Sequence, residues 1–326
     1  MKTHITLTFL FITTFWFAQI PNKTFDWTNA GNNKTLAEFK SVNIWNYGGD
    51  NLGRKSNYTA FNKAKSALGS KGGIIYFRDG VYLFDGGIEI PSNVIIIGQG
   101  KATTLAFELS IEQDAITLKG STSSASLTFA KSAFMGTDRI ELINTAGISK
   151  GDLLKLSLPN STLTTSEWAK GSIGQLTKIK SISGNTVLLE DQLRFNFPLD
   201  QTPKIEKIIP IANAGISCLQ IIGQDNTVSS TSLIKLEYTN NCFVKNVVSE
   251  YCNLAHVEIS NSYKTEVKGC YFRLANDVSG SSLGHGVSLK NSSSNCLIED
   301  NIFSFLTHSI LLQAGTNGNV IAYNYS

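Results

Sequence analysis

The chain has 326 residues, of which 42% are hydrophobic and 16% charged, and its formal net charge is +3 at pH 7. A nearly neutral chain lacks the basic stripe of a nucleic-acid-binding protein, and its hydrophobic content excludes a disordered chain. The sequence is rich in asparagine and glycine but has only 2 methionines and 6 prolines, so turn formers dominate and a mostly β protein is favoured.

The first 18 residues have the features of a secretory signal peptide. Lys2 supplies a positive charge, and an uncharged, largely apolar run follows from Ile5 to Ala18. This run is short of the ~20 residues that a bilayer span requires. No later segment is long and apolar enough to cross a membrane. We therefore expect the mature chain to be secreted, either free or at the cell surface.

Residues 19–114 have the pattern of a capped solenoid. Apolar residues recur at helical spacing within 58–68, at Phe61, Ala64 and Leu68, and a glycine-rich stop follows. Short β-type runs separated by turn signals come next, and they cover 74–77, 81–84, 88–90 and 94–97. Strands this short between tight turns favour a solenoid over a sandwich.

Residues 115–214 have a different residue pattern from the segment before them and are interpreted as a small antiparallel β insertion. Two alternating runs meet at Ser183-Gly184-Asn185, which is typical of a hairpin loop. The segment contains no histidine and no combination of residues typical of catalysis.

Residues 215–326 contain a repeat that predicts the fold. One apolar column recurs at Ile234, Val257, Val287 and Ile310, and a second column recurs at Val244, Val267, Ile298 and Ile321. Both columns share a period of about 23 residues, with one lengthened repeat at the same place, which is typical of a solenoid of stacked β coils. Asparagines at the corners, Asn241 with Asn295 and Asn301 with Asn324, predict amide ladders along the stack.

Two segments resemble a known family. Gly72–Tyr82 and Ile90–Gly100 are similar to the opening of the pectate-lyase superfamily. The resemblance implies an all-β, right-handed parallel β-helix, with 58–68 as the N-terminal capping helix and 115–214 as an insertion. Lyases, hydrolases, epimerases and non-catalytic adhesins share this fold, so the resemblance leaves the activity open.

The candidate active site lies in the lengthened coil. His285 and His308 each stand two residues before an apolar column position, so they are expected to stack on adjacent coils about 4.8 Å apart. The extra residues of this coil include Arg273 and Asp277. They would lie over the edge of the coil at which the two histidines stand. Glu250 shares a register with Arg273 on the neighbouring coil, and an ion pair is expected there.

This set of residues is suited to an acidic polysaccharide. A lyase acting by β-elimination neutralises a uronate carboxylate, with arginine or bound Ca²⁺, and presents a base to the neighbouring proton. His285, His308, Arg273 and Asp277 are the candidate catalytic residues, and calcium is the one candidate cofactor. The candidate substrate-binding residues are Glu250, Lys268, Lys290 and Gln313.

Three alternatives stay open beside the lyase. The stretch Gly284–Leu289 resembles one in polygalacturonases, but the paired aspartates that those hydrolases use are absent, so their catalytic roles cannot be carried over. The chain could instead be a non-catalytic, glycan-binding surface protein. Finally, the histidines and Asp277 could only satisfy turn hydrogen bonds.

The five cysteines show no Cys-x-x-Cys spacing and are expected to be buried thiols: Cys218, Cys242, Cys252, Cys270 and Cys296. The last repeat stops partway through a coil, without the polar cap that ends a solenoid. We therefore expect 215–326 to continue in a longer natural protein, which in its full-length form would be a monomer.

Overall fold

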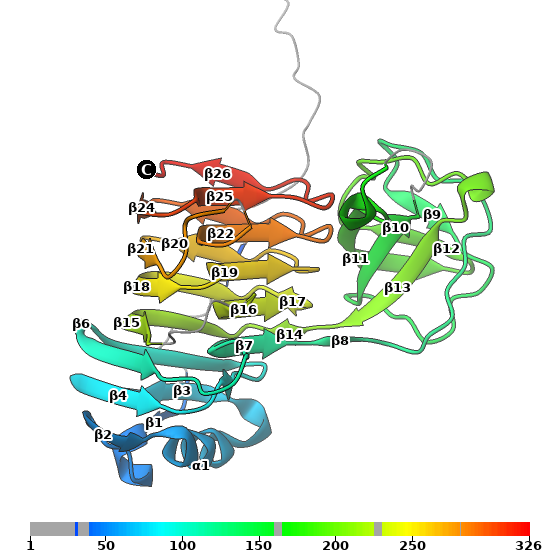
Figure 1. The fold of residues 1–326 in the computed structure, drawn as a ribbon. Coiled ribbons are helices and arrows are strands. Elements are labelled where there is room, and N and C mark those ends of the chain that lie inside the picture. The colour runs from blue at the N-terminus through cyan, green and yellow to red at the C-terminus, as the bar shows by residue number, and fades with distance from the viewer. Residues whose placement is uncertain (1–29, 32–38, 160–164, 225–229, 281) are drawn as a thin grey trace, which may run out of the picture.

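The computed structural model describes residues 30–31, 39–159, 165–224, 230–280 and 282–326, and the predicted signal peptide lies outside these ranges. The chain forms the expected right-handed parallel β-helix, whose coils stack from α1 at the bottom of Figure 1 to β26 at the top. A separate β lobe projects from one side. The predicted fold class is confirmed.

The N-terminal end of the β-helix is closed by a helix. α1 (Tyr58–Leu68) follows β1 (Ser41–Asn43), the 3-10 turn η2 (Ile44–Tyr47) and β2 (Leu52–Ser56), and it is followed by the 3-10 turn η3 (Gly69–Lys71). It buries Ala60, Phe61, Ala64 and Leu68 against the first coil. The helix ends at Gly69, whose φ of 65° suits a residue without a side chain. The expected capping helix is confirmed.

Two parallel sheets form the walls of the β-helix. Sheet A has twelve strands. Two of them are β1 and β2, and the other ten are β3 (Gly73–Tyr76), β4 (Gly80–Phe84), β6 (Val94–Phe107), β15 (Gly215–Gly223), β18 (Phe243–Cys252), β20 (Glu266–Lys268), β21 (Tyr271–Ala275), β23 (Leu297–Glu299), β24 (Ile302–Ser304) and β26 (Val320–Ala322). Sheet B consists of β5 (Ile88–Glu89), β7 (Ile116–Lys119), β16 (Ser232–Glu237), β19 (Ala255–Ser260), β22 (His285–Lys290) and β25 (His308–Leu312). A two-stranded pair, β14 (Ile211–Ala212) and β17 (Thr239–Asn240), lies at a corner.

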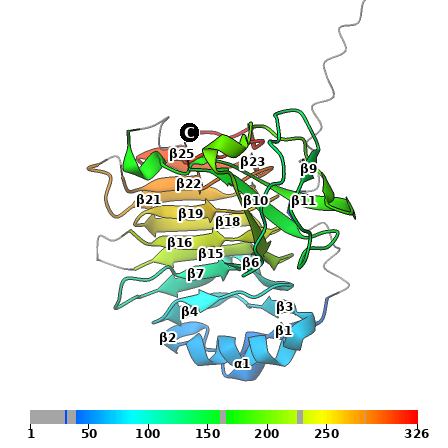
Figure 2. The ribbon, with the colours of Figure 1, turned by 90° about the vertical axis from the view of Figure 1, so that its right-hand side faces the viewer.

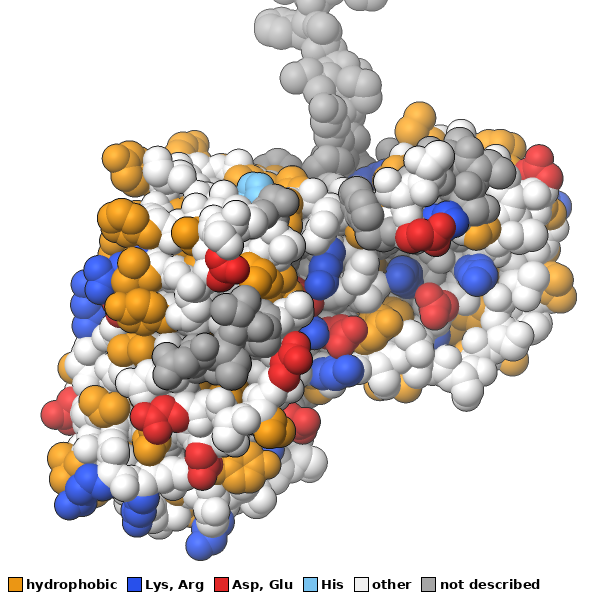
Figure 3. Space-filling view, viewed as in Figure 1, with side chains coloured by type: hydrophobic (Ala, Val, Ile, Leu, Met, Phe, Trp, Pro, Cys, Tyr) orange, Lys and Arg blue, Asp and Glu red, His pale blue; other side chains and the backbone are white. Residues whose placement is uncertain are grey.

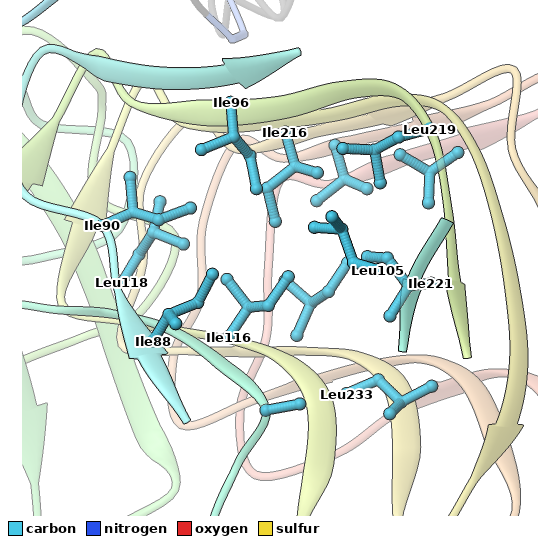
Figure 4. Packing of buried hydrophobic residues seen from close by; sticks show 14 of the residues in the cluster. Ile88, Ile90, Ile96, Leu105, Ile116, Leu118, Ile216, Leu219, Ile221 and Leu233 are labelled. Atoms are coloured by element: carbon cyan, nitrogen blue, oxygen red, sulfur yellow. The ribbon is translucent and has the colours of Figure 1, made fainter. Parts of the chain in front are cut away.

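The strand registers match both apolar columns of the repeat. Val257 of β19 pairs with Val287 of β22, and Val287 pairs with Ile310 of β25. Val267 pairs with Ile298 in sheet A. The columns meet inside the β-helix, where aliphatic side chains from both sheets interdigitate (Figure 4). Burial of this continuous apolar surface, at about 25 cal/mol per Å², is the main force that holds the coils together.

One of the two expected asparagine ladders forms. Asn301 donates to the Asn324 Oδ1 at 3.0 Å, and its own Oδ1 accepts the amide of Cys270. The ladder predicted for Asn241 and Asn295 is wrong. Asn295 instead donates to the Asp191 carboxylate at 2.8 Å, because the inserted lobe covers its corner.

The lobe is a six-stranded antiparallel sheet with its own core. Its strands are β8 (Ser121–Thr122), β9 (Arg139–Glu141), β10 (Leu153–Leu158), β11 (Ile173–Ser183), β12 (Thr186–Leu189) and β13 (Lys204–Ile209), with 3-10 turns η4 (Glu167–Ala169) and η5 (Leu199–Gln201). The predicted hairpin joins β11 to β12. The expected bounds 115–214 are too wide, because Ile116 and Leu118 are fully buried in the β-helix core. The lobe itself runs from 121 to 209.

The lobe packs over the corner turns of the last coils (Figure 2). The Tyr263 hydroxyl donates to the Asp191 Oδ2 at 2.7 Å, and Arg194 donates to Asn295 and to Asn317. Leu153 and Leu176 add a small apolar contact around Tyr263. Because these buried polar groups satisfy one another, they fix the orientation of the lobe against the coils.

All five cysteines are free, and four of them are buried, with Cys218 partly accessible. Burial raises the pKa of the Cys242, Cys270 and Cys296 thiols to about 12. These thiols therefore act as small apolar side chains, as expected. No helix in the described ranges is both long enough and apolar enough to span a membrane.

Candidate functional site

Two histidines stand side by side on sheet B. His285 opens β22, His308 opens β25, and the strand register aligns the two residues. Their Nδ1 atoms lie 3.2 Å apart, and the ring centroids are separated by 5.0 Å. The expected stacking on adjacent coils is therefore confirmed.

The two glycines that flank His285 have steric roles. Gly284 has a φ of 77°, and a Cβ there would lie 2.8 Å from the Asp277 carbonyl oxygen. A Cβ on Gly286 would overlap the Phe303 ring and the Ser309 carbonyl oxygen. The similarity of 284–289 to the polygalacturonase stretch thus includes two positions that tight packing explains.

The environment of His285 favours its neutral form. Burial lowers the pKa of the imidazole below its usual value, and the neighbouring His308 and, to a lesser extent, Lys290 lower it further. A hydrogen bond with the backbone of Ser282 opposes the shift. His285 is therefore a neutral imidazole near pH 7, which can accept a proton.

The third histidine of the repeat region does not belong to this pair. His256 is fully buried, its Nδ1 lies 2.8 Å from the Ser249 Oγ, and its ring packs against Phe272. Burial lowers its pKa to about 3. His256 is thus a neutral core residue.

The structure divides the predicted site residues between the two sheets. Arg273 lies on β21 of sheet A, where it forms the expected ion pair with Glu250 at 2.7 Å. Lys268 lies on β20 of the same sheet and pairs with Glu299 at 2.9 Å. The interaction with Glu250 holds the Arg273 guanidinium and raises its pKa. Arg273 is therefore bound to a carboxylate of its own sheet.

Asp277 is engaged within its own loop. Its carboxylate accepts the amide of Ser279 at 2.7 Å, and hydrogen bonds from Ser279 lower its pKa. Its backbone lies beside Gly284, so the loop does reach the start of β22. The contacts of Asp277 are those of a turn residue, and its role in catalysis stays a prediction.

The outer face of sheet B carries a second group of charges. Glu258 of β19 is 2% exposed and lies 3.0 Å from the Lys290 Nζ and 3.8 Å from the Lys235 Nζ. Lys235 also contacts Asp114 at 3.3 Å. Gln313 follows β25, and its backbone N–H donates to the Leu289 carbonyl oxygen. Lys290 and Gln313 thus belong to the same sheet region as the histidines, whereas Lys268 and Glu250 lie on sheet A.

The inserted lobe forms a second wall beside this face. Lys155 of β10 reaches the β-helix and donates to the Asn261 Oδ1 at 2.7 Å. Figure 3 shows basic and acidic side chains gathered in the hollow where the two modules meet, with a histidine visible on the same side of the molecule. Sequence reasoning missed Lys155, because nothing in its local pattern indicates which surface the lobe contacts.

The structure assigns no position to a calcium ion. Within the part of the chain that the structure describes, no three His, Cys, Asp or Glu side chains are grouped so as to hold a metal.

The fold is that of a right-handed parallel β-helix protein, and part of the chain is similar to a pectate lyase-like family. A family model described as "Rhamnogalacturonase A/epimerase, pectate lyase-like" matches residues 41–185, which include the cap, the first coils and most of the lobe. This match confirms the resemblance found in the sequence. No curated protein matches the chain.

Solved structures of phage tailspikes share the fold. The tailspike protein gp49 of Pseudomonas phage LKA1 is 16% identical with a TM-score of 0.58, over 82% of this chain and 49% of that one. The tailspike gp61 of Pseudomonas phage phi297 is 10% identical with a TM-score of 0.58, over 87% and 59% of the two chains. The gp54 tailspike of Acinetobacter baumannii bacteriophage AP22, solved with a capsular saccharide, is 16% identical with a TM-score of 0.50, over 80% and 51%. The chain thus spans about half the length of these structures.

Proposed function

We propose that this protein is a secreted polysaccharide lyase that binds an acidic glycan on the outer face of sheet B. The pairing of His285 with His308 carries the proposal, because it couples the neutral imidazole of His285, which is 2% exposed, to His308, which is partly accessible on the neighbouring strand. The family match to a pectate lyase-like model and the saccharide bound to the AP22 tailspike support a polysaccharide partner. The signal-like first 18 residues support export.

In the proposed reaction, one imidazole removes the proton next to the uronate carboxylate. The electron pair of that C–H bond forms a carbon–carbon double bond, and the glycosidic C–O bond breaks. The departing oxygen takes up a proton. The second imidazole holds the first in position through the Nδ1–Nδ1 contact and shares the transferred proton. Lys290, at the far end of the strand that His285 opens, would attract the carboxylate of a neighbouring sugar unit.

The hydrolase alternative has less support from the geometry. Asp114 and Glu258 both contact Lys235, so two carboxylates do lie near each other on sheet B. However, Glu258 is 2% exposed beneath Lys235 and Lys290, and a sugar could reach it only by displacing both lysines. A hydrolase requires both carboxylates to be open to the scissile bond.

The test is a screen of the purified protein against pectate, alginate and neutral glycans. A lyase releases unsaturated products that absorb ultraviolet light, a hydrolase releases reducing ends without that absorbance, and a binding protein retains the glycan unchanged. We expect absorbance to rise with an acidic glycan and to be lost in His285→Ala. Lys245→Ala, on the outer face of sheet A, is the matched control. Retention without turnover would replace the lyase with a glycan-binding protein.

A further inference from the structure

We infer that the inserted lobe supplies part of the glycan-binding site, in which Lys155 and Lys290 together bind a carboxylate of an acidic sugar. The inference rests on the proposed function and adds a second module to it. Lys155 comes from β10 of the lobe, whereas Lys290 ends β22 of the β-helix.

The position of Lys155 is fixed by contacts between the two modules. β10 lies at the centre of the lobe sheet, between β11 and β13. Leu153, two residues before Lys155 and therefore on the same face of β10, packs around Tyr263 of the β-helix. The Lys155 Nζ then reaches the Asn261 Oδ1 at 2.7 Å. The ammonium group is thus held at the junction of the two modules, beside the residue that directly follows β19 of sheet B.

A chain of short polar side chains connects Lys155 to Lys290. Asn261 and Asn291 both donate to the Ser260 Oγ, at 3.2 and 2.9 Å. Ser260 is paired with Lys290 in the register of β19 and β22. The two lysines therefore approach the same small patch from opposite modules, and amide and hydroxyl groups lie between them. Such groups bind carboxylate and hydroxyl oxygens of sugars.

The Lys155 charge has no direct counter-charge in the described part of the chain. Burial lowers the pKa of this half-buried lysine, and the nearby Glu206 opposes that shift. Glu206 stands opposite Lys155 on β13, yet no carboxylate of the described residues forms an ion pair with the Lys155 Nζ. Lys290, by contrast, contacts Glu258 at 3.0 Å. A desolvated ammonium that bonds only to a neutral amide is stabilised when an anion binds beside it.

The positions of these side chains along sheet B also suit a polymeric ligand. Sheet B carries the histidines at the start of β22 and β25, and Lys290 at the end of β22. A sugar bound at Lys155 and Lys290 would therefore be one part of a chain whose neighbouring units lie over the imidazoles. The ligand class is an acidic oligosaccharide rather than a free small anion.

The test measures binding of short pectate and alginate oligosaccharides by calorimetry, with neutral xylan oligosaccharides as the comparison. All variants carry His285→Ala, so that turnover does not consume the ligand. Lys155→Met should weaken binding of the acidic oligosaccharides about 10-fold or more and reduce its salt dependence, and it should leave neutral ligands unaffected. Lys290→Met should do the same, whereas Lys155→Arg should retain binding. Lys245→Met, which removes a lysine from the outer face of sheet A, is the control.

The outcomes separate this inference from the proposed function. If acidic oligosaccharides bind and Lys155→Met binds them equally well, the lobe subsite is wrong and the lyase proposal stands. If the protein neither binds nor cleaves any acidic oligosaccharide, the proposed function is wrong and the proposed subsite is wrong as well. Thermal unfolding of each variant shows whether it folds. If Lys155→Met is unfolded, Lys290→Met and Lys155→Arg decide the question.

Discussion

The Nδ1 atoms of His285 and His308 lie 3.2 Å apart on neighbouring strands of one parallel sheet. At this distance one ring must donate a hydrogen bond and the other must accept it, so the pair holds a proton between its members. Burial lowers the pKa of His285, and the second ring lowers it further, because charging both rings would place two cations in contact. The pair is therefore expected to act as one unit.

We predict that His285→Gln and His308→Gln each reduce kcat/KM on the acidic substrate by roughly 10²–10⁴-fold, and that the double variant is little worse. Because the pKa of His285 is lowered, the wild-type rate should fall only as the pH drops below about 6.5. A pH–rate profile on the three variants and the wild type measures both effects. Independent, additive losses would show that the imidazoles do not act together.

The second prediction concerns the buried His256 and stability in acid. Its pKa is about 3 in the folded protein against an ordinary value of 6.5 for histidine, so the unfolded chain binds the proton more tightly. The resulting stability is fully present above pH 6.5 and is lost as the pH falls towards 3. This shift corresponds to roughly 5 kcal/mol as an upper value. Urea unfolding between pH 3 and 7 measures it.

His256→Phe with Ser249→Ala is the variant that isolates this effect. Phenylalanine can occupy the stack on Phe272, and alanine removes the hydroxyl that would otherwise lose its partner. The unfolding free energy of this variant should depend much less on pH between 6.5 and 3. An unchanged pH dependence would mean that other groups cause the acid sensitivity.

The third prediction separates structure from catalysis at Arg273. Removing its side chain leaves the Glu250 carboxylate, whose side chain is 9% exposed, without its ion-pair partner. Arg273→Ala should therefore lower the thermal midpoint, and Arg273→Ala with Glu250→Ala should restore part of the loss. If Arg273→Ala instead abolishes turnover at an unchanged midpoint, the residue contacts substrate, as the sequence had suggested.

The fourth prediction tests the contact between the lobe and the last coils. A Cβ on Gly315 would overlap the Ser172 carbonyl oxygen, and the φ of 78° adds strain of roughly 1–2 kcal/mol. Gly315→Ala should therefore expose β10 and β11 to hydrogen exchange at the surface that faces the coils. Gly100→Ala is the matched control, because its φ is 63° and no atom lies within 4 Å of the added Cβ. Equal protection in both variants would contradict the close contact.

The fifth prediction concerns the thiols. Cys218 is the one partly accessible cysteine, and the other four are buried. Iodoacetamide should therefore label the native protein once, at Cys218, and the urea-unfolded protein five times. Mass spectrometry counts the labels. Rapid labelling of Cys242 or Cys296 in native protein would show that the coils open, because burial raises the pKa of both thiols to about 12.

Much of the β-helix could be predicted because its contacts repeat along the sequence. The spacing of Val257, Val287 and Ile310 determines their register, and the same register places His285 against His308. The ion pair of Arg273 with Glu250 follows from that rule as well. A solenoid makes such predictions feasible, since each residue stacks on its equivalent in the next coil.

The sequence by itself determined the coils, the capping helix, the inserted lobe and the histidine pair, because each depends on local periodicity or on contacts between adjacent repeats. Only the tertiary structure decided that Arg273 and Lys268 lie on sheet A, away from the sheet that carries the histidines. It also decided that Asn295 binds Asp191 and that Lys155 meets Asn261. These contacts join residues about a hundred positions apart, across the docking of two separate cores. Their geometry depends on how the two surfaces fit, which no repeat in the chain encodes.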